Sequence, residues 1–250
     1  MSAVNPTDTR PATDAGPLGG AAVLPKRKGR IKKILFRGLL ALVALVAVAQ
    51  LVYTFSGSKQ WEFVGERQGV TVYSMKVPGE NLKKFRGLVQ VNASMSKIVM
   101  FMQDQENELN VGFYKPREIG RDGPRIQWTD WRGEFPEPFK DRQFVVKHEF
   151  SQDPSNKQVF YQITATPDLV PPDDCCVRIP RMDNYWRLTP IGTGRTEIEW
   201  VIDMDVGGFL PYFVINASHP ELMYDFASRL QGFFDQKKYD NAHYDWIVEP

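Results

Sequence analysis

The fold class is decided by two neighbouring stretches, TEIEWVIDMD at Thr196–Asp205 and SHPELMYDFASRLQGFF at Ser218–Phe234. The first alternates apolar and polar side chains, which predicts a strand with one buried face. The second predicts an amphipathic helix of about four turns, because large apolar side chains recur at helical spacing: Leu222, Phe226, Leu230 and Phe233. A long half-buried strand followed by such a helix is typical of an α+β fold. In that fold, a curved antiparallel sheet wraps around the C-terminal helix.

The ends of the helices are marked by capping residues. Ser218 and Glu221 have the spacing of a capping box, so the C-terminal helix is expected to begin there. Pro220 would then lie in its first turn, where proline is tolerated. A second helix is expected over Ser94–Glu108. The period-two pattern predicts strands over Gly69–Met75, Phe85–Asn92, Arg125–Trp131, Arg142–Phe150, Gln158–Thr166, Tyr185–Thr189 and Thr196–Asp205.

The same alternation assigns side chains to the two faces of the sheet. In Arg142–Phe150, the side chains of Phe144, Val146 and His148 share one face, and Phe150 continues it. A curved sheet with large aromatic side chains on its concave face encloses either a ligand cavity or a solid core. The pattern is compatible with both interpretations.

The N-terminal part of the chain differs from the rest in charge and hydropathy. Residues 1–60 carry nine Lys and Arg against two Asp and Glu, whereas residues 61–250 carry 22 against 28. Residues 1–37 are expected to form a disordered tail with a basic end, because Pro, Gly, Ala and Thr dominate their first part. Residues 38–58 then run for 21 positions without a charge. At about 1.5 Å per residue, a helix of this length just spans a hydrocarbon core about 30 Å thick.

Two processing outcomes fit this apolar run. It is either a retained transmembrane anchor or a cleaved secretory signal, with Ala47 and Ala49 at the cleavage site and a mature N-terminus at Gln50. The continuation of the run through Tyr53 and Phe55 favours the anchor. In both cases the basic flank stays in the cytoplasm, where it would also lie favourably against anionic headgroups. We therefore expect an inner-membrane protein whose residues 59–250 form one periplasmic domain.

The composition excludes several classes of protein. Hydrophobic residues make up 42% of the chain, which is enough to bury a sizeable core. The net charge of +1 provides no basic excess for a nucleic-acid partner. Two cysteines and three histidines predict neither a disulfide scaffold nor a zinc ribbon, so no metal site and no cofactor are expected. The sequence carries no indication of a protein partner.

Four segments from Trp61 onward occur together in an order that resembles a known family. They are GVTVY at Gly69–Tyr73, FPEPFKDRQFVV at Phe135–Val146, YWRLTPIGTGRTEIEW at Tyr185–Trp200 and DVGGFLPYFVIN at Asp205–Asn216. In this order they resemble the START domains, the steroidogenic-acute-regulatory-related lipid transfer family. The resemblance covers about 180 residues. It implies a helix-grip fold that encloses one lipid, such as a sterol or a phospholipid, and a lipid-binding or lipid-transfer protein without enzymatic activity.

The resemblance also implies where the ligand would lie. The expected lining of the cavity is Trp128, Asp130, Phe144, Val146, His148, Tyr161, Ile163, Trp200, Ile202, Phe226 and Leu230. Arg142 matches an arginine of the family, and we expect it to tie strands together through an ion pair or carbonyl contacts. Gln143 stands where the family has an acid, which changes the polar end of the pocket.

The loop Thr166–Cys176 falls where the resemblance implies a gate. Its prolines prevent regular structure, and Leu169 and Val170 provide an apolar tip. An ordinary surface connection is the alternative interpretation. The adjacent Cys175 and Cys176 are expected to be two free thiols, and a strained disulfide between them is the alternative in an oxidising compartment.

His148 is the most informative polar residue of the predicted apolar face. A buried imidazole needs a hydrogen-bond partner, and Asp130 is the expected one, on the same face as Trp128. Such a pair could bind the polar group of a lipid, or it could be a satisfied histidine of the core. It could also act as general acid and base in a cyclase-like enzyme. A ligand-sensing adaptor for a membrane partner is a further alternative.

Overall fold

A computed structural model describes residues 28–106 and 112–250. Its elements are α1 (Lys28–Phe55), β1 (Glu62–Arg67), β2 (Val70–Met75), β3 (Lys84–Val91), α2 (Met95–Gln103), β4 (Phe113–Asp122), β5 (Ile126–Gly133), β6 (Asp141–Gln152), β7 (Val159–Ala165), β8 (Cys176–Arg178), β9 (Arg181–Gly192), β10 (Arg195–Ile202), β11 (Met204–Asp205), α4 (Tyr212–Phe234) and the short 3-10 helix η1 (Lys237–Tyr239). The expected α+β architecture is confirmed. Each expected strand overlaps an observed one.

The strands form one sheet in the order β1-β2-β3-β10-β9-β7-β6-β5-β4, with every neighbouring pair antiparallel. The short β8 runs parallel to the start of β6, and β11 pairs with β9. Both outer strands are irregular. The pairing of β1 with β2 shifts between Phe63 and Gly65, and the pairing of β4 with β5 shifts twice between Tyr114 and Gly120.

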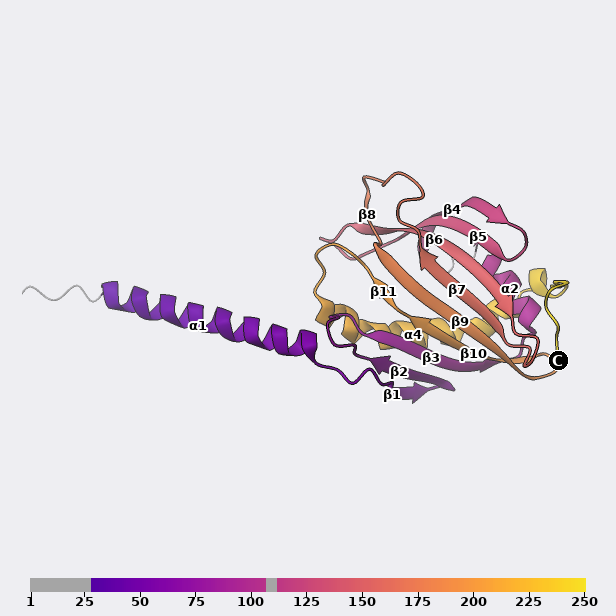
Figure 1. Ribbon diagram of the computed structural model, residues 1–250, viewed down its shortest axis with the longest axis horizontal. Coiled ribbons are helices and arrows are strands. Elements are labelled where there is room, and N and C mark those ends of the chain that lie inside the picture. The colour runs from indigo at the N-terminus through magenta and orange to yellow at the C-terminus, as the bar shows by residue number, and fades with distance from the viewer. Residues whose placement is uncertain (1–27, 107–111) are drawn as a thin grey trace, which may run out of the picture. The chain divides into compact units, whose positions relative to one another are not determined.

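The helix α4 crosses one face of this sheet (Figure 1). Its buried side chains include Met223, Ala227 and Leu230, which belong to the same core as Leu188 and Trp200 of the sheet. A second, smaller cluster lies around Trp131 and Phe144 and extends to Val206, ahead of α4. The described part of the chain therefore has a curved sheet whose concave face packs against the C-terminal helix.

The predicted start of α4 was wrong. The helix begins at Tyr212, so Pro220 lies inside it. The Ser218 hydroxyl donates to the carbonyl of Ile215 and caps no helix. The capping-box spacing was misleading because Ser and Glu also occur on the exposed face of an established helix. The preceding run Tyr212–Ala217 is itself helical and brings further side chains to the sheet.

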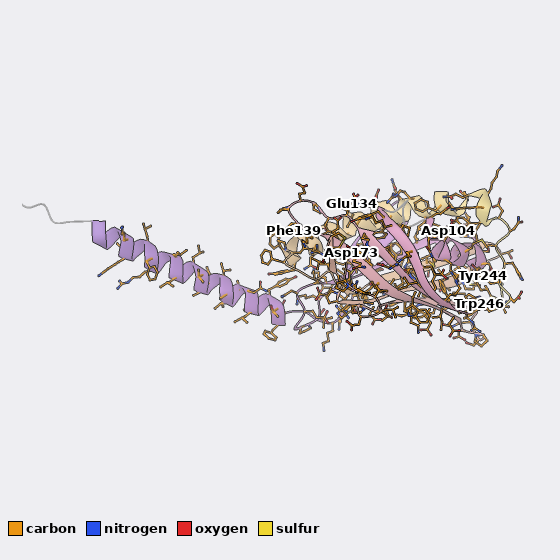
Figure 2. The ribbon with its side chains drawn as sticks, turned by 90° about the horizontal axis from the view of Figure 1, so that it is seen from above. Asp104, Glu134, Phe139, Asp173, Tyr244 and Trp246 are labelled. Carbon is orange, nitrogen blue, oxygen red and sulfur yellow. A yellow bond between two sulfur atoms is a disulfide. The ribbon has the colours of Figure 1, made fainter. Side chains whose placement is uncertain are left out.

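The helix α2 is shorter than expected. It ends at Gln103, and Ser94 is its N-cap, with the Ser94 hydroxyl accepting from the amide of Lys97 at 3.3 Å. The rest of the predicted helix runs into residues 107–111, which lie outside the described residues. Asp104, just after α2, accepts hydrogen bonds from Lys238 and Tyr239. Figure 2 shows Asp104 toward the same end of the domain as Tyr244 and Trp246.

The apolar N-terminal run forms part of α1. This helix begins at Lys28 and ends at Phe55, so the expected bounds of 38 and 58 are displaced. Residues 28–37 were expected to be disordered, but they form the first turns of α1. The rest of the expected tail, residues 1–27, lies outside the described residues. Lys32–Phe55 is long and apolar enough to be either a membrane span or a signal sequence.

Candidate functional site

The candidate site is the concave face of the sheet beneath α4. The register of the strands decides which side chains reach it. Val146 pairs with Thr129 of β5 and with Ala165 of β7, and His148 pairs with Gln127 and with Ile163. In an antiparallel sheet, directly paired residues point to the same face.

His148 lies between two hydroxyl groups at the centre of this face. Its Nε2 is 2.7 Å from the Thr129 hydroxyl, and its Nδ1 is 2.5 Å from the Tyr161 hydroxyl. Burial, together with the positive charge of the nearby Arg121 guanidinium, lowers the pKa of His148 to about 4. The imidazole is therefore neutral at physiological pH, with one ring nitrogen donating and the other accepting.

The expected pair of His148 with Asp130 is not formed. Asp130 pairs in register with Val145, so it points to the opposite face of the sheet. The residues that share the face of His148 are the alternate ones of β5, Gln127 and Thr129. Trp128 is two positions from Asp130 on the same strand, so it also points away from the concave face. The prediction failed because β5 carries large side chains on both faces, so alternation alone did not indicate which one is concave.

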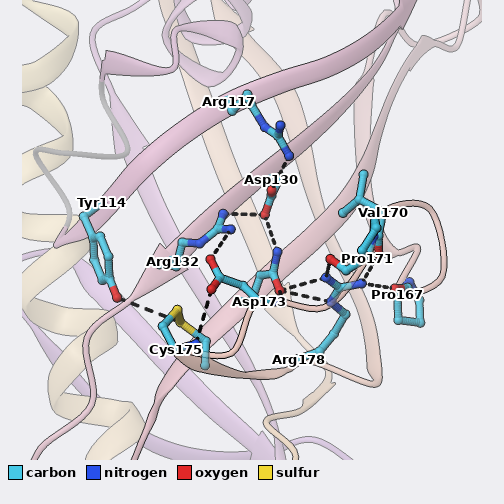
Figure 3. Close-up of polar contacts among 12 residues, drawn as sticks. Tyr114, Arg117, Asp130, Arg132, Pro167, Val170, Pro171, Asp173, Cys175 and Arg178 are labelled. Carbon is cyan, nitrogen blue, oxygen red and sulfur yellow. Dashed lines mark hydrogen bonds and ion pairs between the residues drawn. A yellow bond between two sulfur atoms is a disulfide. The ribbon is translucent and has the colours of Figure 1, made fainter.

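Asp130 is instead the centre of a polar network on the other face (Figure 3). Its carboxylate accepts from Arg117 at 2.8 Å, from Arg132 at 2.6 Å and from Gln143 at 3.0 Å. Arg132 also donates to Asp173 at 2.9 Å. The network thus joins β4, β5 and β6 to the loop that was predicted to be a gate.

That loop is fastened by Arg178. The guanidinium of Arg178 donates to the carbonyls of Pro167, Val170 and Pro171, and to the side chain of Gln143. Within the loop, Leu169 is 53% exposed, as its predicted place at an apolar tip requires. Val170 is half-buried.

Cys175 and Cys176 form a disulfide, so the expectation of two free thiols was wrong. Asp173 precedes the pair and accepts from the amide of Cys175 at 3.2 Å, while its carboxylate binds Arg132. The Tyr114 hydroxyl lies 4.0 Å from the sulfur of Cys176. The contacts of Asp173 therefore hold the segment that precedes the two cysteines against β5.

Arg142 makes the carbonyl contacts expected of it. It is buried, and its guanidinium donates to Val206 at 2.7 Å and to Gly207 at 3.0 Å, with a further bond to Lys140. It also lies over the ring of Phe135, 4.5 Å from its centre. Arg142 therefore connects the start of β6 to the segment that leads into α4.

The other residues expected to line a cavity divide into two groups. The first group is buried in the core, as expected if the concave face forms a solid core: Phe144, Val146, Tyr161, Trp200 and Leu230. Ile163, Ile202 and Phe226 pack against the same core but keep part of their surface accessible. Trp186 has the same half-buried state, with its ring 5.8 Å from that of Phe226.

Sequence reasoning missed Thr129 and Trp186. Both lie on the concave face, Thr129 beside His148 and Trp186 beneath α4. Trp186 and Leu188 alternate with charged or polar neighbours, and this pattern could have identified Trp186 as an inward side chain. Thr129 could be found only from the register between β5 and β6.

Two surface clefts lie outside this face. One, of about 390 Å³, is lined by the β2–β3 loop, the segment before α4 and the first turn of α4. The other, of about 260 Å³, lies between Arg125, Lys157 and Trp246 near the C-terminus. Neither lining includes a residue that was expected to line the ligand cavity.

Comparison with solved structures identifies the fold. A STAR-related lipid transfer protein from Xanthomonas axonopodis has a TM-score of 0.65 and 21% identity, over 70% of this chain and 99% of that one. Human StAR-related lipid transfer protein 5 has a TM-score of 0.59 and 18% identity, over 79% of this chain and 96% of that one. The chain therefore has the START-like helix-grip fold that the sequence predicted.

Comparison of sequences adds one relative. An uncharacterized protein of Pseudomonas aeruginosa, PA1579, is 24% identical over 182 residues, which are 72% of this chain and 90% of that protein. No family model matches the chain.

Proposed function

We propose that this protein is a membrane-tethered lipid-binding protein that holds one apolar ligand between the concave face of the sheet and α4. The fold supports this function, because a solved bacterial structure of the same fold is a STAR-related lipid transfer protein and is covered almost completely. Transfer of the ligand between membranes is part of the proposal, as is the role of α1 as the tether.

The observation that carries the proposal is the state of His148. It is a neutral imidazole in contact with two hydroxyl groups, on a face where it adjoins the packed apolar core. A buried polar cluster of this kind can exchange hydrogen bonds with one hydroxyl or headgroup oxygen, while the surrounding side chains contact only hydrocarbon. This combination fits an amphipathic lipid better than a soluble polar metabolite.

The apolar part of the ligand would contact the half-buried side chains. Ile163, Ile202 and Phe226 come from two strands and from α4, and each keeps accessible surface next to the packed core. Burial of apolar surface contributes about 25 cal/mol per Å², so an acyl chain or sterol needs few polar contacts to bind. An outward displacement of α4 would enlarge the space beside these residues.

Photo-crosslinking in vesicles tests the proposal. The full chain would be reconstituted with a phospholipid that carries a diazirine on its acyl chain, then irradiated and digested for mass spectrometry. We expect labelled peptides that contain Ile163, Ile202 or Phe226, in addition to peptides of α1, which contacts lipid in any case. Labelling confined to α1 would contradict the proposal.

A matched pair of variants makes this test specific. Ile163→Trp fills the space beneath α4 and is expected to reduce labelling of the domain several-fold. Phe160→Trp alters the opposite face of the same strand, where Phe160 is exposed, and is expected to leave labelling unchanged. Equal labelling of both variants would place the lipid elsewhere.

A further inference from the structure

The end of α1 is a structural part of the domain. The chain divides into two compact units, and Gln50–Phe55 belong to the same unit as the sheet and α4. Gln50 makes two contacts there: its side-chain amide donates to Asn81 at 3.3 Å, and its carbonyl accepts from the Tyr212 hydroxyl at 2.6 Å. The Thr54 hydroxyl donates to Asn81 at 2.8 Å.

Tyr53 completes this set of contacts. Its hydroxyl accepts from the side-chain amide of Asn216 at 2.9 Å, and its ring stacks on Tyr212 with ring centres 4.9 Å apart. Lys76 donates to the carbonyl of Thr54 at 3.1 Å. We call the group Gln50, Tyr53 and Thr54 of α1, with Asn81, Tyr212 and Asn216 of the domain, the latch.

The polar members of the latch are unusual for an apolar helix. A glutamine amide in hydrocarbon is strongly unfavourable when it is unpaired, because nothing there replaces the hydrogen bonds that it makes with water. Here Gln50 and Thr54 pair with Asn81, and Gln50 also pairs with Tyr212. The helix therefore presents these groups to the domain, whereas Leu51 and Val52 between them are exposed.

The latch holds two segments that carry exposed apolar side chains. Tyr212 and Asn216 lie in the first turns of α4. Phe209, just before the helix, is 89% exposed, and Phe213, in its first turn, is 65% exposed. Asn81 lies in the β2–β3 loop, and Asn81 and Tyr212 both line the cleft of about 390 Å³. Large apolar side chains with this much exposure mark a contact with another apolar phase.

We propose that the latch fixes the first turn of α4 and the β2–β3 loop against the bilayer that α1 enters, so that Phe209 and Phe213 insert into its surface. The partner is therefore the leaflet next to the protein's own anchor. Lys32–Phe55 has the length of a span and includes three latch residues, so the segments bound to them lie at the membrane surface. This inference rests on the tether of the proposed function and assigns the membrane-facing side of the domain.

Depth-dependent quenching of a fluorescent label tests the inference. The full chain would carry an environment-sensitive fluorophore on a cysteine at position 209, in vesicles of phosphatidylcholine and phosphatidylglycerol with a spin-labelled acyl chain. The control label is at Arg195, which is exposed at the opposite end of β10 from the segment before α4. We expect at least threefold stronger quenching at position 209 than at position 195.

Removal of the latch tests its role. Gln50→Leu with Thr54→Val keeps α1 apolar but deletes the hydrogen bonds that these two side chains make with Asn81 and Tyr212. The double variant is expected to reduce quenching at position 209 by at least half. The control Val52→Leu changes an exposed position of the same turn and is expected to have no effect.

Two outcomes would overturn the inference: equal quenching at positions 209 and 195, or quenching at 209 that does not change when the latch is removed. Alkaline carbonate extraction of membranes distinguishes failure of the tether from failure of this inference. A chain released by carbonate would contradict the tether itself, whereas a retained chain with a water-exposed label at 209 would contradict only the inference.

Discussion

The ring nitrogen Nδ1 of His148 lies 2.5 Å from the phenolic oxygen of Tyr161, its neighbour on the next strand, inside the core. Burial lowers the pKa of His148 from 6.5 to about 4. Between these values the unfolded chain binds a proton that the folded chain does not. The associated stability is therefore present above about pH 6.5 and lost as the pH falls toward 4, by about 3 kcal/mol in total.

Urea unfolding in detergent, followed by tryptophan fluorescence, would measure this loss at about pH 7 and about pH 4.5. His148→Gln retains a polar side chain but does not titrate, so this variant is expected to lose less stability over the same interval than the native chain. An identical pH dependence in both proteins would contradict the assignment of the loss to His148.

Asp130 is predicted to be a structural residue that acts independently of His148. Asp130→Ala leaves the buried Arg132 and Gln143 without their shared acceptor. Loss of one partner in a buried ion pair costs about 3–5 kcal/mol. Arg117→Ala is the control, because Arg117 binds the same carboxylate but its side chain is 61% exposed, and we expect a cost below about 1 kcal/mol. A change in the pH dependence assigned to His148 in Asp130→Ala would contradict the separation of the two residues onto opposite faces.

Gly87 is predicted to be required beneath Trp200. These residues pair in register, and a Cβ at position 87 would lie 2.4 Å from the indole ring. Gly87→Ala must displace a buried tryptophan, so we expect a destabilisation of about 1–3 kcal/mol by urea unfolding. Gly232→Ala is the matched control in α4, where a Cβ meets no atom within 4 Å. Since alanine favours the helix, that variant is expected to be more stable by about 0.5–1 kcal/mol.

The Cys175–Cys176 disulfide predicts the compartment of the domain. Disulfides persist in an oxidising environment such as the periplasm. In isolated membranes, a thiol-reactive maleimide is expected to modify neither cysteine before reduction and both after it, as read by mass spectrometry. Modification of both without reduction would indicate a cytoplasmic domain and the opposite orientation of α1.

The sequence predicted the main elements because their periodicity is strong. The alternation in β10 and the helical spacing from Leu222 to Phe233 both survive in the structure. The strands β1 and β4 were not predicted, because their exposed side chains and their shifted pairings remove the period-two pattern. Regular strands with one buried face can therefore be predicted from sequence, whereas irregular edge strands cannot.

The candidate site depended on information that a single sequence does not carry. Whether Thr129 or Asp130 faces His148 depends on a register shift of one residue, and such a shift exchanges the two faces of a strand. The contacts of Gln50 and Tyr53 with α4 join residues more than 150 positions apart. His148 itself was identified correctly, because a polar residue within an apolar face is visible without the fold.

The two irregular outer strands limit how this protein can associate. An open sheet with straight borders would offer free amide and carbonyl groups to an extended peptide or to a second copy. In this sheet both borders, β1 and β4, are interrupted by shifts in pairing, and β4 also contains Pro116. These interruptions disfavour continuous backbone pairing with another chain, and so they limit polymerisation of the protein through the borders of its sheet.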